Sequence, residues 1–192
     1  MRPRLFLTAT VLLASACGGA TPRPATSAEV VSDIPAWFTN TPNDPNFMYA
    51  ASTAESRDMQ LAVNKATTDG RSNIAQQMEA RMQGLTRRFQ EETGLGADAQ
   101  LLDQFTTATK AVVNQTLSGS RVAKQEIKAN GANYRAFVLV ELPIGVASQA
   151  LRERIRANEQ MMTRFRSTEA FRELDAEVQR YEEFQRRQPR TP

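Results

Sequence analysis

Cys17 is the residue whose possible chemical roles are most restricted by the other residue types in the chain. It is the only cysteine among 192 residues, and the chain has no histidine. A catalytic thiol needs a neighbour such as histidine to hold it as a thiolate. A single cysteine cannot form an internal disulfide or a CxxC centre. The sequence therefore favours another role for Cys17, the covalent attachment of a further group.

Carboxylates are the other side chains that could carry a reaction. The candidates are Asp69, Asp98, Asp103, Glu126 and Glu141. The absence of histidine from the sequence excludes histidine-based triads and nearly all zinc sites, so an enzyme would need paired carboxylates, lysine chemistry or a carboxylate-bound metal. None of the five acids belongs to a recognisable constellation of that kind. We predict no catalytic residue, no metal site and no cofactor, and keep a carboxylate-dependent enzyme as an alternative.

Residues 1–16 have the layout of a signal peptide. Arg2 and Arg4 precede an uncharged apolar run, and small residues then lead to Cys17. The run is shorter than the roughly 20 residues that span a bilayer. The stretch resembles a bacterial lipobox, in which the cysteine becomes the first mature residue and carries lipid, although Ala14 stands where leucine is usual. An ordinary secretory signal with an incidental cysteine is the alternative.

Residues 17–34 are expected to form a lipidated N-terminus and a flexible tether, because small residues and prolines dominate them. Gly18, rather than aspartate, follows the cysteine. By resemblance to enterobacterial sorting rules, this favours lipid anchoring at the outer membrane, with the domain facing the periplasm.

The net charge gives little support to a nucleic-acid partner. The formal charge is +3, from 24 basic and 21 acidic residues. Loss of Arg2 and Arg4 with the signal peptide would leave 22 basic residues against 21 acidic ones. A nearly neutral chain lacks the basic surface that polyanions require, so we expect no nucleic-acid partner.

The elements that would follow the tether begin with a proline-punctuated loop that carries Trp37 and Phe38. We expect these rings to pack on the domain as a lid, and an exposed aromatic interaction site is the alternative. Residues 47–53 then read as a strand, with Phe47 and Tyr49 on one face.

A long amphipathic helix is predicted over residues 57–92. Apolar side chains recur every three or four places from Met59 to Phe89. Ala62, Ala66 and Gly70 are small at successive i+4 positions, which should let the helix lie close to a sheet. Thr93-Gly94 ends this helix.

A second helix is expected to follow, with Asp98 as a candidate N-cap and an apolar face from Leu101 to Leu117. Two helices joined by a short loop suit an antiparallel pair.

A β-hairpin is predicted around Asn130-Gly131, a dipeptide typical of type I′ turns. A two-residue turn at these positions would pair Ile127 with Tyr134 and would set Glu126 opposite Arg135. The second strand ends at Pro143.

Residues 144–188 read as a helical C-terminal segment with two apolar stripes. One stripe is predicted to contain Leu151, Ile155, Met162 and Phe165, and the other to contain Phe171, Leu174, Val178 and Tyr181. A break or a cap is expected at Ser167-Thr168. The second stripe fits either docking on the body or pairing with another helix in a short coiled coil.

Together these elements predict an α+β fold: a small three-stranded sheet (strand, helix, helix, β-hairpin, helix) packed by long helices, with a helical C-terminal extension. Several short motifs occur in a characteristic order: Pro35, Trp37 and Pro42, the strand with Tyr49, Ala62-Ala66-Gly70-Arg71, Leu117-Ser118-Gly119-Ser120 and YRAFVLVEL. In this order they resemble the LPP-twenty-type family of bacterial lipoproteins over residues 35–143. Ser52 stands near a place where that family often has glycine.

The resemblance implies a small α+β domain anchored at the outer membrane, and some relatives take part in flagellar or surface-structure assembly. It brings no catalytic residues. We therefore expect a non-enzymatic lipoprotein of the cell envelope with a scaffold or interaction role. Its partners would be the membrane, through lipid on Cys17, and other envelope proteins, with Trp37 and Phe38 as possible interaction residues. Binding of a lipid or of peptidoglycan is the alternative, for which a cavity under the sheet or a groove between helices would be the sign.

Overall fold

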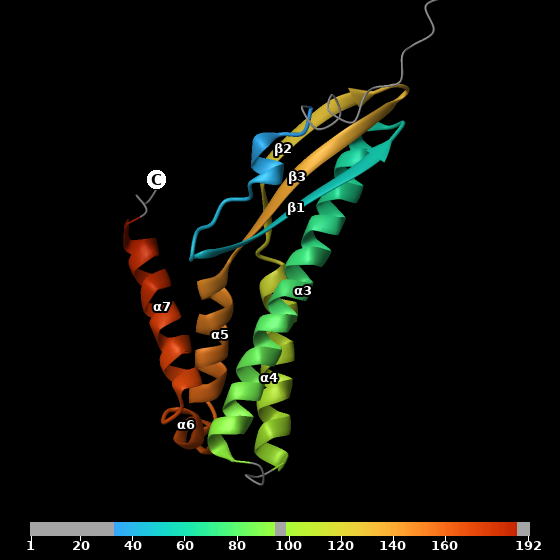
Figure 1. The fold of residues 1–192 in the computed structure, drawn as a ribbon. Helices are drawn as coiled ribbons and strands as arrows, with labels where there is room; N and C mark the ends of the chain where they lie inside the picture. Colours follow the sequence, from blue (N-terminus) through green and yellow to red (C-terminus); the bar gives the residue numbers. More distant parts are fainter. Residues whose placement is uncertain (1–32, 95–98, 188–192) are drawn as a thin grey trace, which may run out of the picture. The chain divides into compact units, whose positions relative to one another are not determined.

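The sheet is three-stranded and antiparallel, in the order β1-β3-β2 (Figure 1). The computed structural model describes residues 33–94 and 99–187. The strands are β1 (Phe47–Ser56), β2 (Arg121–Asn130) and β3 (Asn133–Pro143). Long helices lie between and after the strands in the predicted order, so the α+β class with a helical C-terminal part is confirmed, and a single helical turn before β1 was not predicted.

β3 is the central strand and is covered on both faces. Ala136, Val138 and Val140 belong to the main core, while Phe137 and Leu139 on the opposite face are also buried. This explains why the strand reads as an unbroken apolar run rather than as an alternating pattern.

The hairpin forms as predicted, but the predicted register is wrong by two residues. Gly131 and Ala132 make the turn, Asn130 pairs with Asn133, and Ile127 pairs with Ala136. Both primed turn types require a positive φ at the first central position. Gly131, with a φ of +60°, occupies that position, where the predicted turn would have placed Asn130, and glycine adopts such a φ without steric cost.

The charged pair expected across the hairpin is therefore absent from it. Glu126 lies opposite Phe137 and forms an ion pair with Lys128, two residues along the same strand, at 3.3 Å. The Nε of Arg135 donates instead to Glu55 Oε1 of β1 at 2.5 Å.

β2 is an edge strand whose side chains are mostly exposed, and its pairing with β3 shifts register between Val122 and Lys124.

α3 (Met59–Thr93) packs one stripe of side chains against the sheet and the other helices. Its first half covers β1 and β3, and its second half runs beside the helices drawn below the sheet in Figure 1. Asp58 caps the helix by accepting from the Leu61 N–H at 2.7 Å. Met59 was predicted to begin the buried stripe, and this prediction is wrong. Met59 lies in the first turn of α3 and is 49% exposed.

The small residues of α3 do bring the helix close to the sheet, as predicted. Ala62 and Ala66 are fully buried. A Cβ added to Gly70 would lie 2.6 Å from Val140 Cγ2 and 2.8 Å from Ser52 Oγ. Ser52 takes part in the same contact, since its hydroxyl donates to the Ala66 carbonyl at 2.6 Å.

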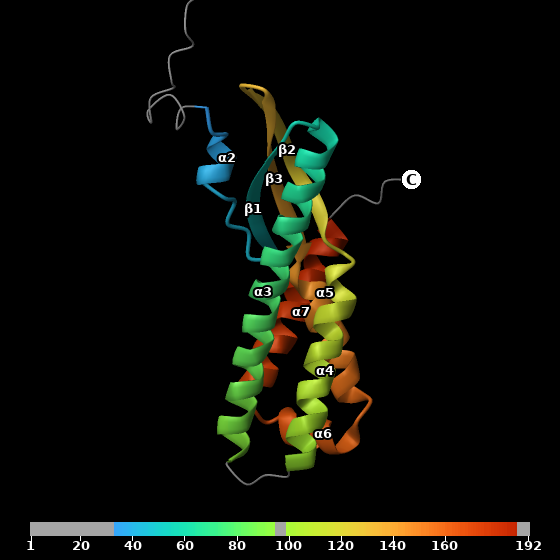
Figure 2. The same cartoon turned by 90° about the vertical axis from the view of Figure 1, so that its right-hand side faces the viewer.

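α4 (Ala99–Leu117) lies beside α3, as Figures 1 and 2 both show. Gly94 follows α3 with a φ of +89°. The predicted N-cap Asp98 lies outside the described residues. Phe89 of α3 stacks on Phe105 of α4 at a centroid distance of 4.6 Å, and Phe165 packs against both rings.

The C-terminal segment forms three helices: α5 (Ile144–Arg156), α6 (Glu159–Phe165) and α7 (Glu169–Arg187). The predicted break at Ser167-Thr168 is confirmed, and Thr168 accepts from the Phe171 N–H at 3.1 Å. A further break at Ala157-Asn158 was not predicted. It changes the phase of the stripe, so Met161 is buried in place of the predicted Met162.

Residues Ile34–Pro192 cluster as one compact unit. α7 packs against α5, so the second apolar stripe docks on the body of the domain. No helix in the described part of the chain is long and apolar enough to span a membrane.

Candidate functional site

The residue with the clearest chemical prediction, Cys17, lies outside the described residues, as do the signal peptide and nearly all of the tether. The candidate surfaces described here belong to the folded domain.

Trp37 and Phe38 form part of α2 (Ala36–Thr39), a single turn drawn in blue beside the sheet in Figure 1. Both side chains are half-buried. Phe38 meets the Phe137 ring of β3 edge-on at a centroid distance of 5.2 Å, and Trp37 meets Phe38 edge-on at 6.2 Å. The pair therefore packs over the face of β3 that α3 does not cover.

Asp98 lies outside the described residues, and the other four candidate carboxylates are not brought together. Glu126 pairs with Lys128, and Glu141 accepts from Arg121 Nε at 2.6 Å. Asp69 and Asp103 are exposed on α3 and α4. Within residues 33–94 and 99–187, no group of three or more acidic, histidine or cysteine side chains is placed to hold a metal ion.

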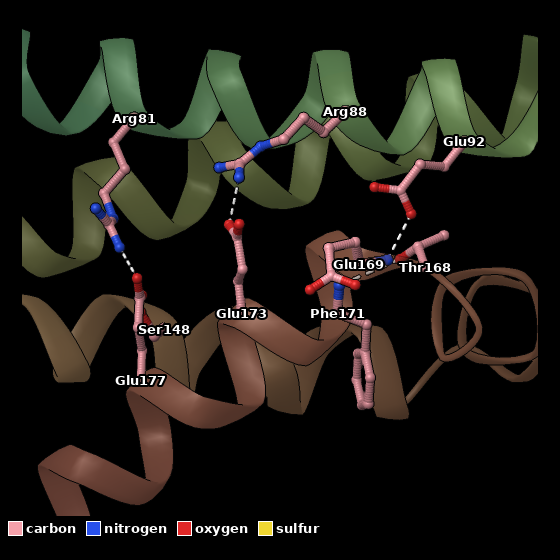
Figure 3. Close-up of polar contacts among 9 residues, drawn as sticks. All are labelled: Arg81, Arg88, Glu92, Ser148, Thr168, Glu169, Phe171, Glu173 and Glu177. Carbon is pink, nitrogen blue, oxygen red and sulfur yellow. Dashed lines mark hydrogen bonds and ion pairs between the residues drawn. The ribbon is translucent and has the colours of Figure 1, made fainter.

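A row of polar contacts joins α3 to α7, which run antiparallel (Figure 3). Arg81 pairs with Glu177, Arg88 pairs with Glu173, and the Glu92 carboxylate accepts from the Glu169 N–H at 2.5 Å. The last contact places a negative charge at the N-terminus of α7, where it complements the helix dipole. We call these three contacts the α3–α7 ladder.

The ladder is anchored more firmly at its Arg81 end. Glu177 also accepts from the Ser148 hydroxyl of α5 at 2.7 Å (Figure 3), and the Glu177 side chain is 18% exposed. Burial, together with the charges of Arg88 and Arg180, lowers the pKa of Arg81 below its usual value. A lowered pKa means that the folded protein favours the charged form of Arg81 less than water does. We therefore expect the ladder to fix the position of α7 and to add little to the free energy of unfolding.

Arg152 makes a second connection, between α5 and α7. Its guanidinium donates to Asp175 Oδ1 at 3.1 Å and to Glu182 Oε1 at 2.9 Å. Burial alone would lower the pKa of Arg152, but the hydrogen bonds with Asp175 and Glu182 outweigh burial and raise it. The Nε atom of this side chain is buried and has no hydrogen-bond partner in the described structure.

The main concavity of interest is an open groove of about 590 Å³ between α3 and α4. It is lined by one stripe of each helix: Glu79, Met82, Gln83, Thr86, Arg87 and Gln90 from α3, and Thr106, Thr109, Lys110, Val113 and Asn114 from α4. We call it the α3–α4 groove. Its volume lies within the range typical of small-molecule sites.

The chemistry of the groove is polar on the walls and apolar below. Met82 and Val113 are each 4% exposed. The hydroxyls of Thr86, Thr106 and Thr109 donate to carbonyls of their own helices, so they mainly offer lone pairs to a ligand. The charged residues Arg87, Lys110 and Glu79 have no ion-pair partner among the described residues.

Neither the α3–α7 ladder nor the α3–α4 groove was predicted from the sequence. The ladder has a signal that could have been found, because Arg81, Arg88 and Glu92 recur at i, i+7 and i+11. Their partners on α7 recur at i, i+4 and i+8. The groove has no comparable signal, because its two stripes are polar and read as solvent-exposed helix faces.

Comparison of the sequence with protein-family models and with curated proteins finds no match.

Proposed function

We propose that this chain is a bacterial lipoprotein, held at the outer membrane by lipid on Cys17, whose folded domain has a non-enzymatic scaffold or interaction role in the cell envelope. The observation that carries the proposal is the order of residues 1–17: two arginines, an uncharged apolar run, small residues and then the only cysteine. Several acyl chains, at about 0.8 kcal/mol per buried CH₂, would hold the domain firmly.

The resemblance of residues 35–143 to LPP-twenty-type lipoproteins supports the same proposal. Some members of that family take part in assembly of flagella or other surface structures, and an assembly role is the form of scaffold function we favour.

Exposed apolar side chains at one end of the sheet support an interaction role. Met59 and Leu61, in the first turn of α3, are 49% and 46% exposed, and Tyr134 is 41% exposed. Tyr134 pairs with Ser56, which lies three residues before α3 begins, so the three side chains belong to the same end of the sheet. A contiguous exposed apolar patch is typical of protein contact sites, and we propose that these three side chains form part of one.

Metabolic labelling with a fatty-acid analogue tests the anchor. We expect the wild-type chain to be labelled and to fractionate with outer membranes, and Cys17→Ser to be unlabelled and released from them. A wild-type chain that is unlabelled and soluble in the periplasm would refute the proposal.

A second function, binding of an envelope ligand such as peptidoglycan or lipid, is favoured by one specific observation. The α3–α4 groove has the size of a small-molecule site, and its charged side chains have no ion-pair partner within residues 33–94 and 99–187, so they are available to a ligand.

A further inference from the structure

We propose that the α3–α4 groove binds a short extended peptide with free ends, three or four residues long. The proposal rests on the second function above and names the class of ligand. It is carried by the charges, the amide groups and the length of the groove.

The two cationic side chains of the groove come from opposite walls, Arg87 from α3 and Lys110 from α4. Both are exposed and lack an ion-pair partner in the described part of the chain. A terminal carboxylate between them would receive charge-assisted hydrogen bonds from both sides. Glu79, the only acid among the described residues that line the groove, offers a partner for a terminal ammonium group.

The uncharged lining matches a peptide backbone. Gln83, Gln90 and Asn114 carry side-chain amides that both donate and accept hydrogen bonds, as peptide groups do. Three threonine hydroxyls, already committed as donors, add acceptors for peptide N–H groups. Met82 and Val113 form a small apolar floor that suits a methyl-sized side chain.

The length follows from helix geometry. Glu79 and Arg87 are eight residues apart on α3, which corresponds to roughly 12 Å along the helix axis. An extended peptide covers at most about 3.3–3.6 Å per residue, so three or four residues span the distance.

Other occupants fit less well. An acyl chain or the apolar face of an amphipathic helix needs a continuous apolar surface. Such an occupant would also leave the charges of Arg87, Lys110 and Glu79, which line the groove, without a partner from the ligand.

Ligand-observed NMR, by saturation transfer from the full-length chain in lipid nanodiscs, tests the proposal. The probes are trialanine with free ends, trialanine with an amidated C-terminus and trialanine with an acetylated N-terminus, with empty nanodiscs as the blank. We expect amidation of the carboxylate to weaken binding about tenfold, as for loss of a hydrogen bond to a charged group. We expect acetylation to have a smaller effect, because a single carboxylate faces that end.

Matched variants locate the site. Arg87→Gln with Lys110→Gln should abolish the preference for the free carboxylate. Lys65→Gln with Arg71→Gln makes the same charge change at exposed positions of α3 outside the groove and should leave the preference intact.

Three results would overturn the proposal: no saturation transfer to any of the peptides, equal binding of the acid and the amide, or equal loss in both double variants. The same measurement on the Cys17→Ser chain in buffer, without nanodiscs, makes the test independent of the lipid anchor. A chain that carries no lipid label but binds the peptide would refute the lipid-anchor proposal alone. A chain that carries the label but does not bind the peptide would refute the groove proposal alone.

Discussion

Gly70 determines how closely α3 can approach the sheet. The space that a Cβ would need is already taken by Val140 and Ser52. Ser52 fills this site with a hydroxyl that satisfies the Ala66 carbonyl, so a polar side chain is tolerated inside the core because its hydrogen bond is made.

Gly70→Ala should therefore destabilise the domain by about 1–3 kcal/mol, because the methyl group would force Val140 or the whole helix to move. Gly84→Ala, on the same helix, is the matched control. Apart from the adjacent helix backbone, no atom of the described residues lies within 4 Å of a Cβ built on Gly84, so this variant should gain up to about 1 kcal/mol of helix propensity. Urea unfolding measures both values. Equal effects of the two substitutions would contradict the close approach at Gly70.

Tyr49 links stability to pH at the alkaline end. Its pKa is raised above the usual value by burial and by the nearby Glu141 and Asp44, with Arg121 acting in the opposite direction. Because the folded state holds this proton more tightly than the unfolded state, stability is complete below the unfolded pKa of about 10 and falls as the pH rises through the folded pKa.

We expect Tyr49→Phe to lose less stability than the wild type between pH 9 and pH 11 in urea unfolding. Tyr134→Phe, at a position that is 41% exposed, is the control. If the three proteins lose stability in parallel over this range, Tyr49 does not contribute to the alkaline transition.

Between elements, the partly buried ion pairs of Arg152 should contribute more to the free energy of unfolding than an exposed ion pair does. Its side chain is 12% exposed and holds two carboxylates of α7, whereas Arg172 and Glu169 pair on the surface with exposures of 69% and 58%. Since the pKa of Arg152 is raised, its contribution is complete at every pH below the usual arginine pKa.

Arg152→Met should cost about 2 kcal/mol at pH 7, the range for hydrogen bonds to charged groups. Arg172→Met should change stability by less than about 0.5 kcal/mol. Thermal or urea unfolding of the two variants makes the comparison. A cost for Arg152→Met no larger than for Arg172→Met would show that the contacts of Arg152 with Asp175 and Glu182 do not stabilise the docking of α7.

The sequence was sufficient for the elements whose cause is local. The α3 stripe, the hairpin and the break at Thr168 follow from residue spacing and from cap or turn chemistry, and all three are present. The register was missed because Gly131 can stand at either central position of a two-residue turn. A positive φ is required at the first central position of both primed turn types, and the structure places Gly131 there instead of Asn130.

The break before α6 had a local signal that was overlooked. Asn158 caps that helix by accepting from the Met161 N–H at 2.9 Å, and asparagine is a preferred N-cap residue. The α3–α4 groove had no such signal, because it exists only where two polar stripes from distant segments face each other.

At the scale of the whole molecule, the C-terminal helices complete the core rather than extend from it. Phe165 of α6 is fully buried and packs against both Phe89 and Phe105, and Leu151 and Ile155 of α5 are also fully buried. Residues 35–143, predicted as a distinct domain, therefore share their core with the segment that follows.

A chain that ends at Pro143 should lose cooperative unfolding and bind the dye ANS, since it would expose Phe89 and Phe105. A chain that ends at Arg187 retains every described helix and serves as the control. Cooperative unfolding of the shorter chain at unchanged stability would show that the C-terminal helices are dispensable.

The irregular edge of β2 should resist pairing with the sheet edge of another copy of the protein. Edge strands are templates on which further strands can add, and lysines and ladder irregularities make them poor templates. Lys124 and Lys128 stand on this edge, and the ladder is interrupted between Val122 and Lys124. If lipid confines many copies to a single membrane plane, collisions between sheet edges become frequent. The features of β2 would then protect the protein against aggregation where its local concentration is highest.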